Sequence, residues 1–138
     1  MRINSQKSQP MKKGNIFSHS FTVTDKIYSG FINLFSDKNP LHTDELFAKE
    51  KGFGNKVMHG NILGGFISFF IGECLPIKNV IIHSQEIKYL NPVYLGDVIN
   101  FKAEISDVFE SVAAIEFKFI FEKDNIRIAK GKIQIGII

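Results

Sequence analysis

The sequence predicts an α+β fold in which an antiparallel β-sheet wraps around one central apolar helix, with short helices inserted before that helix. The first observation is the order of patterns, because one strand-like segment precedes helical segments and residues 80–137 then read as four strands. The second observation is the apolar segment 60–74, which reads as a buried helix. A chain of 138 residues is one domain by prior, so a single sheet has to cover this helix.

The first half of the chain predicts one strand and short helices. Residues 15–24 alternate loosely between apolar and polar side chains, which predicts the first strand. Residues 25–36 carry apolar side chains at helical spacing, which indicates a short amphipathic helix that leads to Asp37. Thr43 can cap a further helix, whose first turn is acidic, and the glycines in residues 52–54 end it.

The second half of the chain predicts strands. Residues 80–90 form a strand with a continuous apolar start, which an Asn-Pro pair ends. Strict alternation in residues 99–105 and 115–121 predicts two strands that each bury one face. Residues 126–137 form the last strand, and its phase slips around Gly131 as a β-bulge would cause.

Positive charge is concentrated at the N-terminus. The formal net charge is +3, and residues 1–14 hold four basic and no acidic side chains, so residues 15–138 carry a net charge of −1. We expect residues 1–14 to be a flexible basic tail and residues 15–138 to form the single domain. Because the body is nearly neutral, neither nucleic acid nor a membrane surface is an expected partner.

Cysteine usage and hydropathy favour a cytoplasmic protein. The single cysteine, Cys74, cannot form an internal disulfide and lies in an apolar segment, which favours a reducing compartment. No apolar core of ~7 residues follows the N-terminal charges, as a signal peptide would require. The densest apolar segment, residues 66–71, is far shorter than the ~20 residues of a membrane span.

The candidate site lies in residues 35–68. Pro40 fixes its own φ and keeps Asn39 out of helical geometry, so the chain should turn here and can aim Asp37 and His42 at one point. Gly60 begins the apolar helix, where the first backbone N–H groups are free to face a ligand. The pattern therefore predicts an acid/base pair facing an oxyanion site.

Simpler roles compete for the same residues. Asp37 alone is typical of a turn or cap, and Asn-Pro is ordinary turn chemistry. His59 is expected to be a structural, hydrogen-bonding histidine. His42, Asp44, His59 and Cys74 lack the paired short spacings of zinc sites, so no metal is expected.

Three linked motifs carry a resemblance to a known family. They are FSDKNPLH at residues 35–42, MHGN at 58–61 before the apolar helix, and NPVYLGD at 91–97. In this order they resemble the MaoC-like, (R)-specific enoyl-CoA hydratases of the hot-dog fold, over roughly residues 17–107. The resemblance implies hydration of a trans-2-enoyl-CoA to an (R)-3-hydroxyacyl-CoA, or the reverse dehydration.

The resemblance also implies roles for individual residues. Asp37 and His42 would hold one water, and the Gly60 N–H would stabilise the thioester oxygen. Ser68 lies at the spacing of the serine that bonds the catalytic Asp in the family, and would orient Asp37. Asn61 departs from the methionine common in the family, which leaves the acyl-chain preference open.

A stripe of small side chains follows the predicted helix. Gly60, Gly64, Ser68 and Gly72 recur every four residues, so they lie on one side and let another group approach closely. That group is either the acyl-pantetheine arm of a substrate or another element of the protein. Asn39, Asn61 and Gly64 are the candidates for substrate contact.

Several functions fit these patterns. The substrate carrier is either CoA or an acyl carrier protein, and the alternatives are a thioesterase and a non-catalytic acyl-thioester binding protein. No cofactor is expected, because the proposed reaction moves only water. A homodimer is expected, because a lone hot-dog domain exposes a sheet edge and because the family pairs its sheets across a two-fold axis.

Overall fold

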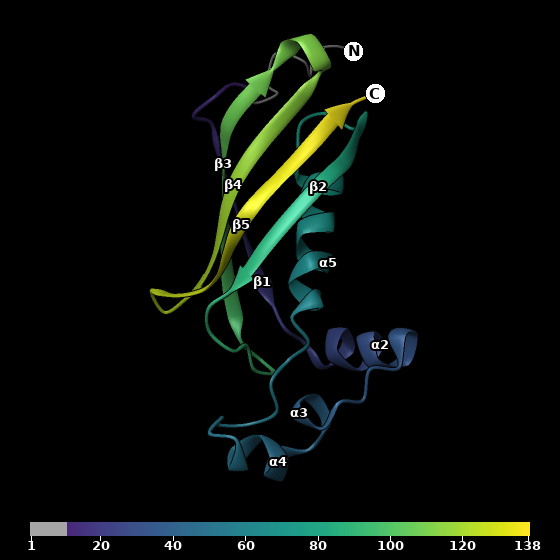
Figure 1. Cartoon of the computed structure of the whole chain (residues 1–138), viewed down its shortest axis with the longest axis vertical. Coiled ribbons are helices and arrows are strands. Elements are labelled where there is room, and N and C mark those ends of the chain that lie inside the picture. The colour runs from purple at the N-terminus through teal and green to yellow at the C-terminus, as the bar shows by residue number, and fades with distance from the viewer. Residues whose placement is uncertain (1–10) are drawn as a thin grey trace.

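A five-stranded antiparallel sheet curves around one helix, in the arrangement that the sequence predicts. The computed structural model describes residues 11–138. The strand order is β1-β3-β4-β5-β2, so β1 and β2 are the two edges (Figure 1). The elements are β1 (Ile16–Thr22), α2 (Asp25–Phe35), α3 (Pro40–Thr43), α4 (Glu45–Glu50), α5 (Asn61–Phe69), a π-helical turn (Phe70–Cys74), β2 (Val80–Tyr89), β3 (Val98–Phe109), a 3₁₀ turn (Glu110–Val112), β4 (Ala114–Lys123) and β5 (Ile126–Ile137).

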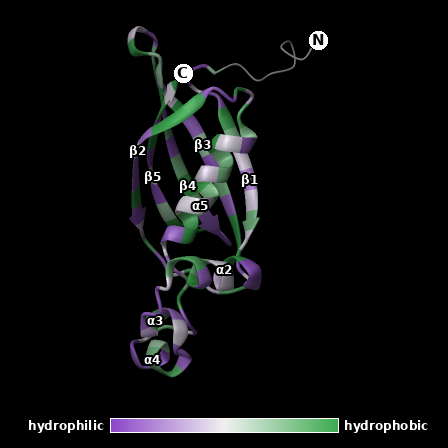
Figure 2. Cartoon of the chain, turned by 90° about the vertical axis from the view of Figure 1, so that its right-hand side faces the viewer, coloured by the Kyte–Doolittle hydropathy of each residue, from purple (hydrophilic) through white to green (hydrophobic). Residues whose placement is uncertain are grey.

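The core lies between α5 and the concave face of the sheet. Helix α5 runs along that face, with β1 and β2 on either side of it (Figure 2). Strict alternation on the strands sends every second side chain inward. The fully buried aromatic side chains of the core are Phe70, Phe101, Phe117 and Phe121.

Short polar caps begin the helices that precede α5. Thr24 caps α2 and Asn39 caps α3, each through its side-chain oxygen. The expected cap at Thr43 is wrong: Asp44 caps α4, because Pro40 starts a separate helical turn that Thr43 ends. Helices α2, α3 and α4 thereby gather beyond one end of the sheet, near the start of α5 (Figure 1).

The expected bulge around Gly131 is misplaced by a few residues. The register of β5 against β4 instead skips Ile128, so Ile128 and Ala129 are buried in succession. Gly131 has a different role, because a Cβ atom there would lie 1.8 Å from the carbonyl oxygen of Glu86. The glycine therefore lets β2 and β5 approach each other closely.

The N-terminal prediction is only partly covered by the described residues. Residues 1–10 of the expected tail lie outside them. Residues 11–14 form a turn in which the Gly14 N–H donates to the Ile105 carbonyl at 2.8 Å, and Met11 packs against the core. Residues 11–14 therefore contact the sheet and the core. Among residues 11–138, no helix is both long and apolar enough to cross a membrane.

Candidate active site

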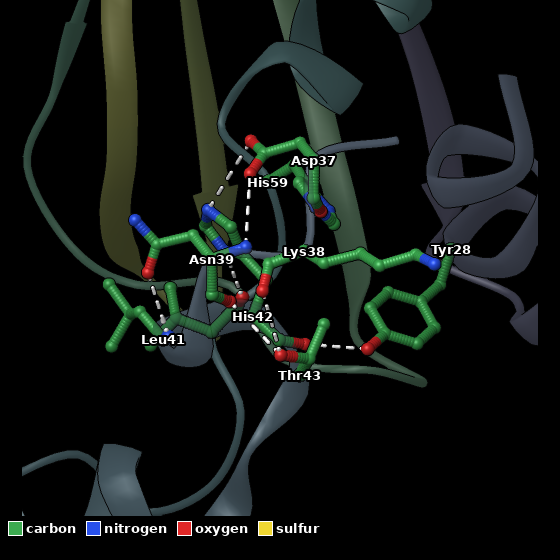
Figure 3. A network of polar contacts seen from close by, with 9 residues as sticks. Tyr28, Asp37, Lys38, Asn39, Leu41, His42, Thr43 and His59 are labelled. Carbon is green, nitrogen blue, oxygen red and sulfur yellow. Dashed lines mark hydrogen bonds and ion pairs between the residues drawn. The ribbon is translucent and has the colours of Figure 1, made fainter. Parts of the chain in front are cut away.

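A bend after α2 positions the predicted acid/base pair. Ser36 adopts a left-handed conformation with φ 59°, which ends α2. The Asp37 Oδ1 atom accepts the Asn39 N–H at 3.2 Å, and the Asn39 Oδ1 atom accepts the Leu41 N–H at 2.9 Å. These local hydrogen bonds fold the chain back, so that Asp37 and His42 face each other, as the proline-containing motif predicts (Figure 3).

One hydrogen bond fixes the tautomer of His42. Its Nδ1 atom lies 2.7 Å from the Val57 carbonyl oxygen, which can only accept, so Nδ1 carries the hydrogen. In the neutral ring Nε2 is then an acceptor, and it lies 3.9 Å from Asp37 Oδ2 (Figure 3). This distance is too long for a direct hydrogen bond, whereas one water can donate to both atoms. The pair is therefore arranged to hold a small donor between its members.

Two aromatic side chains hold this pair in place. The Tyr28 hydroxyl donates to the His42 carbonyl at 2.5 Å. His59 is 3% exposed, its Nε2 lies 2.9 Å from the Asp37 carbonyl oxygen, and its ring stacks on His42 with centroids 4.0 Å apart. These contacts fit the structural role expected of His59.

The same three side chains are close enough to raise the question of a metal. Asp37, His42 and His59 each offer one ligand atom within 4.8 Å of the others, while Asp44 caps α4 instead. His42 Nδ1 and His59 Nε2 are each engaged by a carbonyl oxygen. The stacked rings hold the remaining nitrogens in planes only 29° apart, whereas a metal ion has to lie near the plane of every imidazole that binds it. The geometry suits a held water better than a metal ion.

Gly60 supplies a free donor to the same cavity. It directly precedes α5, and within residues 11–138 its N–H donates to no other group. Gly60, Asp37 and His42 all line one cavity of about 560 Å³. The start of a helix favours negative charge, so an oxyanion in this cavity would be stabilised there.

The small-residue stripe of α5 faces strand β2 at its first two positions. A Cβ atom at Gly60 would lie 2.9 Å from Cε1 of Tyr89, and one at Gly64 would lie 3.6 Å from Nε2 of Gln85. At these positions the closely approaching group is therefore another element of the protein. Tyr89 also lines the cavity, is half-exposed, and has a phenol pKa that its partial burial raises.

Of the other predicted site residues, only Asn61 lines the cavity. Asn61 lines the cavity beside Gly60. Asn39 and Gly64 lie outside the lining of both hollows that contain Asp37. Ser68 is exposed, lies two turns along α5, and within residues 11–138 has no hydrogen bond to Asp37.

Sequence reasoning missed three residues that shape the site. These are Tyr28, Val57 and Tyr89, which respectively fix the backbone of His42, its tautomer and the approach to Gly60. Each acts across at least 14 residues of chain, so no local spacing indicated it. Only the position of Tyr28 on the inner face of its helix offered a signal.

An antiparallel sheet around one helix, with a carboxylate and an imidazole lining the same cavity as the residue that starts this helix, defines a hot-dog protein with a candidate acid/base site. The chain belongs to the family described as MaoC like domain, whose family model matches residues 6–119. The family and the fold expected from the sequence motifs are thereby confirmed.

Curated relatives carry hydratase and dehydratase names. The (R)-specific enoyl-CoA hydratase of Rhodospirillum rubrum is 28% identical over 127 residues, which are 92% of this chain and 84% of that protein. The 3-hydroxybutyryl-CoA dehydratase of Methylorubrum extorquens is 34% identical over 79 residues, 57% of this chain but only half (50%) of that protein. A mitochondrial 3-hydroxyacyl-[acyl-carrier-protein] dehydratase of Solanum lycopersicum is 32% identical over 117 residues, 85% of this chain and 67% of that protein.

Solved structures agree on the fold. The (R)-hydratase of Aeromonas caviae superposes with a TM-score of 0.85 at 23% identity, covering 95% of this chain and 100% of that one. A protein of Archaeoglobus fulgidus superposes with a TM-score of 0.86 at 25% identity, covering 94% of this chain and 81% of that one.

Proposed function

We propose that this protein hydrates trans-2-enoyl-CoA to (R)-3-hydroxyacyl-CoA, or catalyses the reverse dehydration. The proposal depends on one observation: Asp37 Oδ2 and His42 Nε2 are two acceptors 3.9 Å apart in the cavity that Gly60 also lines. A water that donates to both atoms keeps an oxygen lone pair for the substrate. The (R) product is proposed from the names of the Rhodospirillum and Aeromonas relatives.

The chemistry balances with the groups present. The water oxygen bonds to C3 while one water proton passes to the Asp37–His42 pair, and a proton from this pair goes to C2. The thioester oxygen becomes negative during this step, and the Gly60 N–H donates to it. Asn61 is proposed to contact the substrate near this oxygen, and the orienting role of Ser68 stays a prediction.

A second candidate differs only in the carrier. The relative from Solanum lycopersicum is named for an acyl-carrier-protein substrate, and both carriers end in the same pantetheine thioester. The protein is then a (3R)-hydroxyacyl-[acyl carrier protein] dehydratase. Comparing kcat/KM for the CoA and carrier-protein forms of one acyl group decides between the two.

Crotonyl-CoA tests the reaction. We expect the enoyl absorbance to fall, and an (R)-specific 3-hydroxyacyl-CoA dehydrogenase to oxidise the product. Free thiol, measured with a disulfide reagent, should not appear. Thiol release would instead indicate a thioesterase, and saturable binding without turnover would indicate a non-catalytic binding protein.

We also propose that the protein is a homodimer. The sheet ends in two edge strands, β1 and β2, and an edge strand favours pairing with another chain. Sedimentation velocity at micromolar concentration should give twice the mass of one chain. A single species with the mass of a monomer would contradict the proposal.

A further inference from the structure

The cavity of the candidate active site adjoins a larger hollow, which we call the apolar groove. It lies between α2, α5 and β1 and has a volume of about 1010 Å³. Its lining includes Phe21, Ile27, Gly30, Leu34, Gly65 and Phe69. Four residues line both hollows: Phe31, Asp37, Asn61 and Ile62. The groove is therefore continuous with the place where the reacting atoms of a substrate would lie.

The two hollows differ in polarity, as the pantetheine arm and the acyl tail of an acyl thioester do. The cavity around His42 also holds Asn91 and the half-exposed phenol of Tyr89, which suits the amide-rich pantetheine arm. The apolar groove is bounded mainly by hydrocarbon, including the stacked rings of Phe21 and Phe66 at 4.3 Å. The lining of the apolar groove also contains some polar residues, such as Lys26, which lies on the exposed surface of α2.

We infer that the apolar groove binds the hydrocarbon tail of the acyl group, so that thioesters of medium-length and long fatty acids are the preferred substrates. This inference depends on the proposed function, because it assumes that Asp37 marks the reacting carbons. From Asp37 the tail would extend between α2 and β1, away from Tyr89.

Two glycines keep the groove open from opposite walls. A Cβ atom built at Gly30 of α2, or at Gly65 of α5, meets no other atom within 4 Å. Both glycines lie in helix interiors, where glycine is less favourable than alanine. The Cβ atom of a leucine at either position therefore meets no other atom within 4 Å, and the rest of the side chain can reduce the volume of the groove, which makes a direct test possible.

The test is the dependence of kcat/KM on acyl length in the Gly65→Leu variant. Trans-2-enoyl-CoAs of four, six, eight and ten carbons are compared, with Gly72→Leu as a control at another exposed helical glycine that has open space and lies outside the groove. In the unmodified protein kcat/KM should rise by up to about fourfold per added methylene. Gly65→Leu should lower kcat/KM for the ten-carbon substrate at least tenfold more than kcat/KM for crotonyl-CoA, whereas Gly72→Leu should change neither.

Other outcomes overturn the inference in distinguishable ways. An equal loss at all four lengths would place the pantetheine arm in the groove, and a loss accompanied by a changed sedimentation coefficient would place a second copy there. No loss at any length would show that the groove is not used.

Equilibrium binding of saturated acyl-CoAs over the same lengths tests the groove without any turnover. Absence of turnover with intact length-dependent binding would contradict the proposed function and leave the groove assignment standing. If Gly65→Leu does not fold, Gly30→Leu fills the groove from the opposite wall and should give the same length-dependent loss.

Discussion

Asp37→Asn will lower kcat for crotonyl-CoA about 10³-fold, and His42→Gln will do the same, because general acid–base catalysis typically contributes 10²–10⁴-fold. The Asn amide cannot take up a proton from water, and its nitrogen would present donors to the place that the water occupies. The fold should persist, because His59 bonds the main-chain carbonyl of Asp37 rather than its side chain. Steady-state kinetics and thermal unfolding of each variant check both expectations.

The double variant Asp37→Asn/His42→Gln sharpens this test. If both side chains grip one water, the double variant should be little slower than either single variant, because groups that act as a unit are not additive. Asp124→Asn is the matched control, since Asp124 is exposed in a turn with φ 50°, a conformation that Asn also adopts. Losses that multiply to about 10⁶-fold would show that the two side chains act independently.

The fold was predictable because its signals are local and repeated. Alternation in residues 99–105 and 115–121 indicates which side chains enter the core, and Phe101 and Phe117 are fully buried as the alternation requires. The convergence of Asp37 and His42 was predictable for the same reason. Pro40 and the Asx hydrogen bonds around it lie within the segment that they bend.

Features that depend on contacts between distant segments were not predictable from spacing. The tautomer of His42 is set by Val57, 15 residues away, and the close approach at Gly60 is set by Tyr89 on β2. The bulge lies at Ile128, whereas the sequence predicted it near Gly131. The prediction was misplaced because a glycine that lets a neighbouring backbone approach gives the same sequence signal as a glycine in a bulge.

Gly60→Ala will lower kcat about 10²-fold. Alanine keeps the backbone N–H, but its methyl group should push the Tyr89 ring into the cavity and move the thioester away from that N–H, which costs about as much as losing one oxyanion donor. The backbone of Gly60 has φ −59° and ψ −33°, which alanine adopts readily, so the substitution introduces no backbone strain. The new Cβ atom would instead lie 2.9 Å from Cε1 and 3.0 Å from Cζ of Tyr89. The ring must then move, and the open space beside it is the cavity where the thioester should bind.

A double-mutant cycle with Tyr89→Ala separates this collision from other effects of the methyl group. In the Tyr89→Ala background the alanine at position 60 meets no ring, so Gly60→Ala should cost less than tenfold there. Gly64→Ala is the matched control on the same side of α5, since its Cβ atom meets Gln85 at an ordinary 3.6 Å and turnover should stay near that of the unmodified protein. If Gly60→Ala costs the same with and without the Tyr89 ring, the methyl group itself blocks the thioester. The Gly60 N–H would then have to be reached across the Cα face of this residue, where only glycine leaves room.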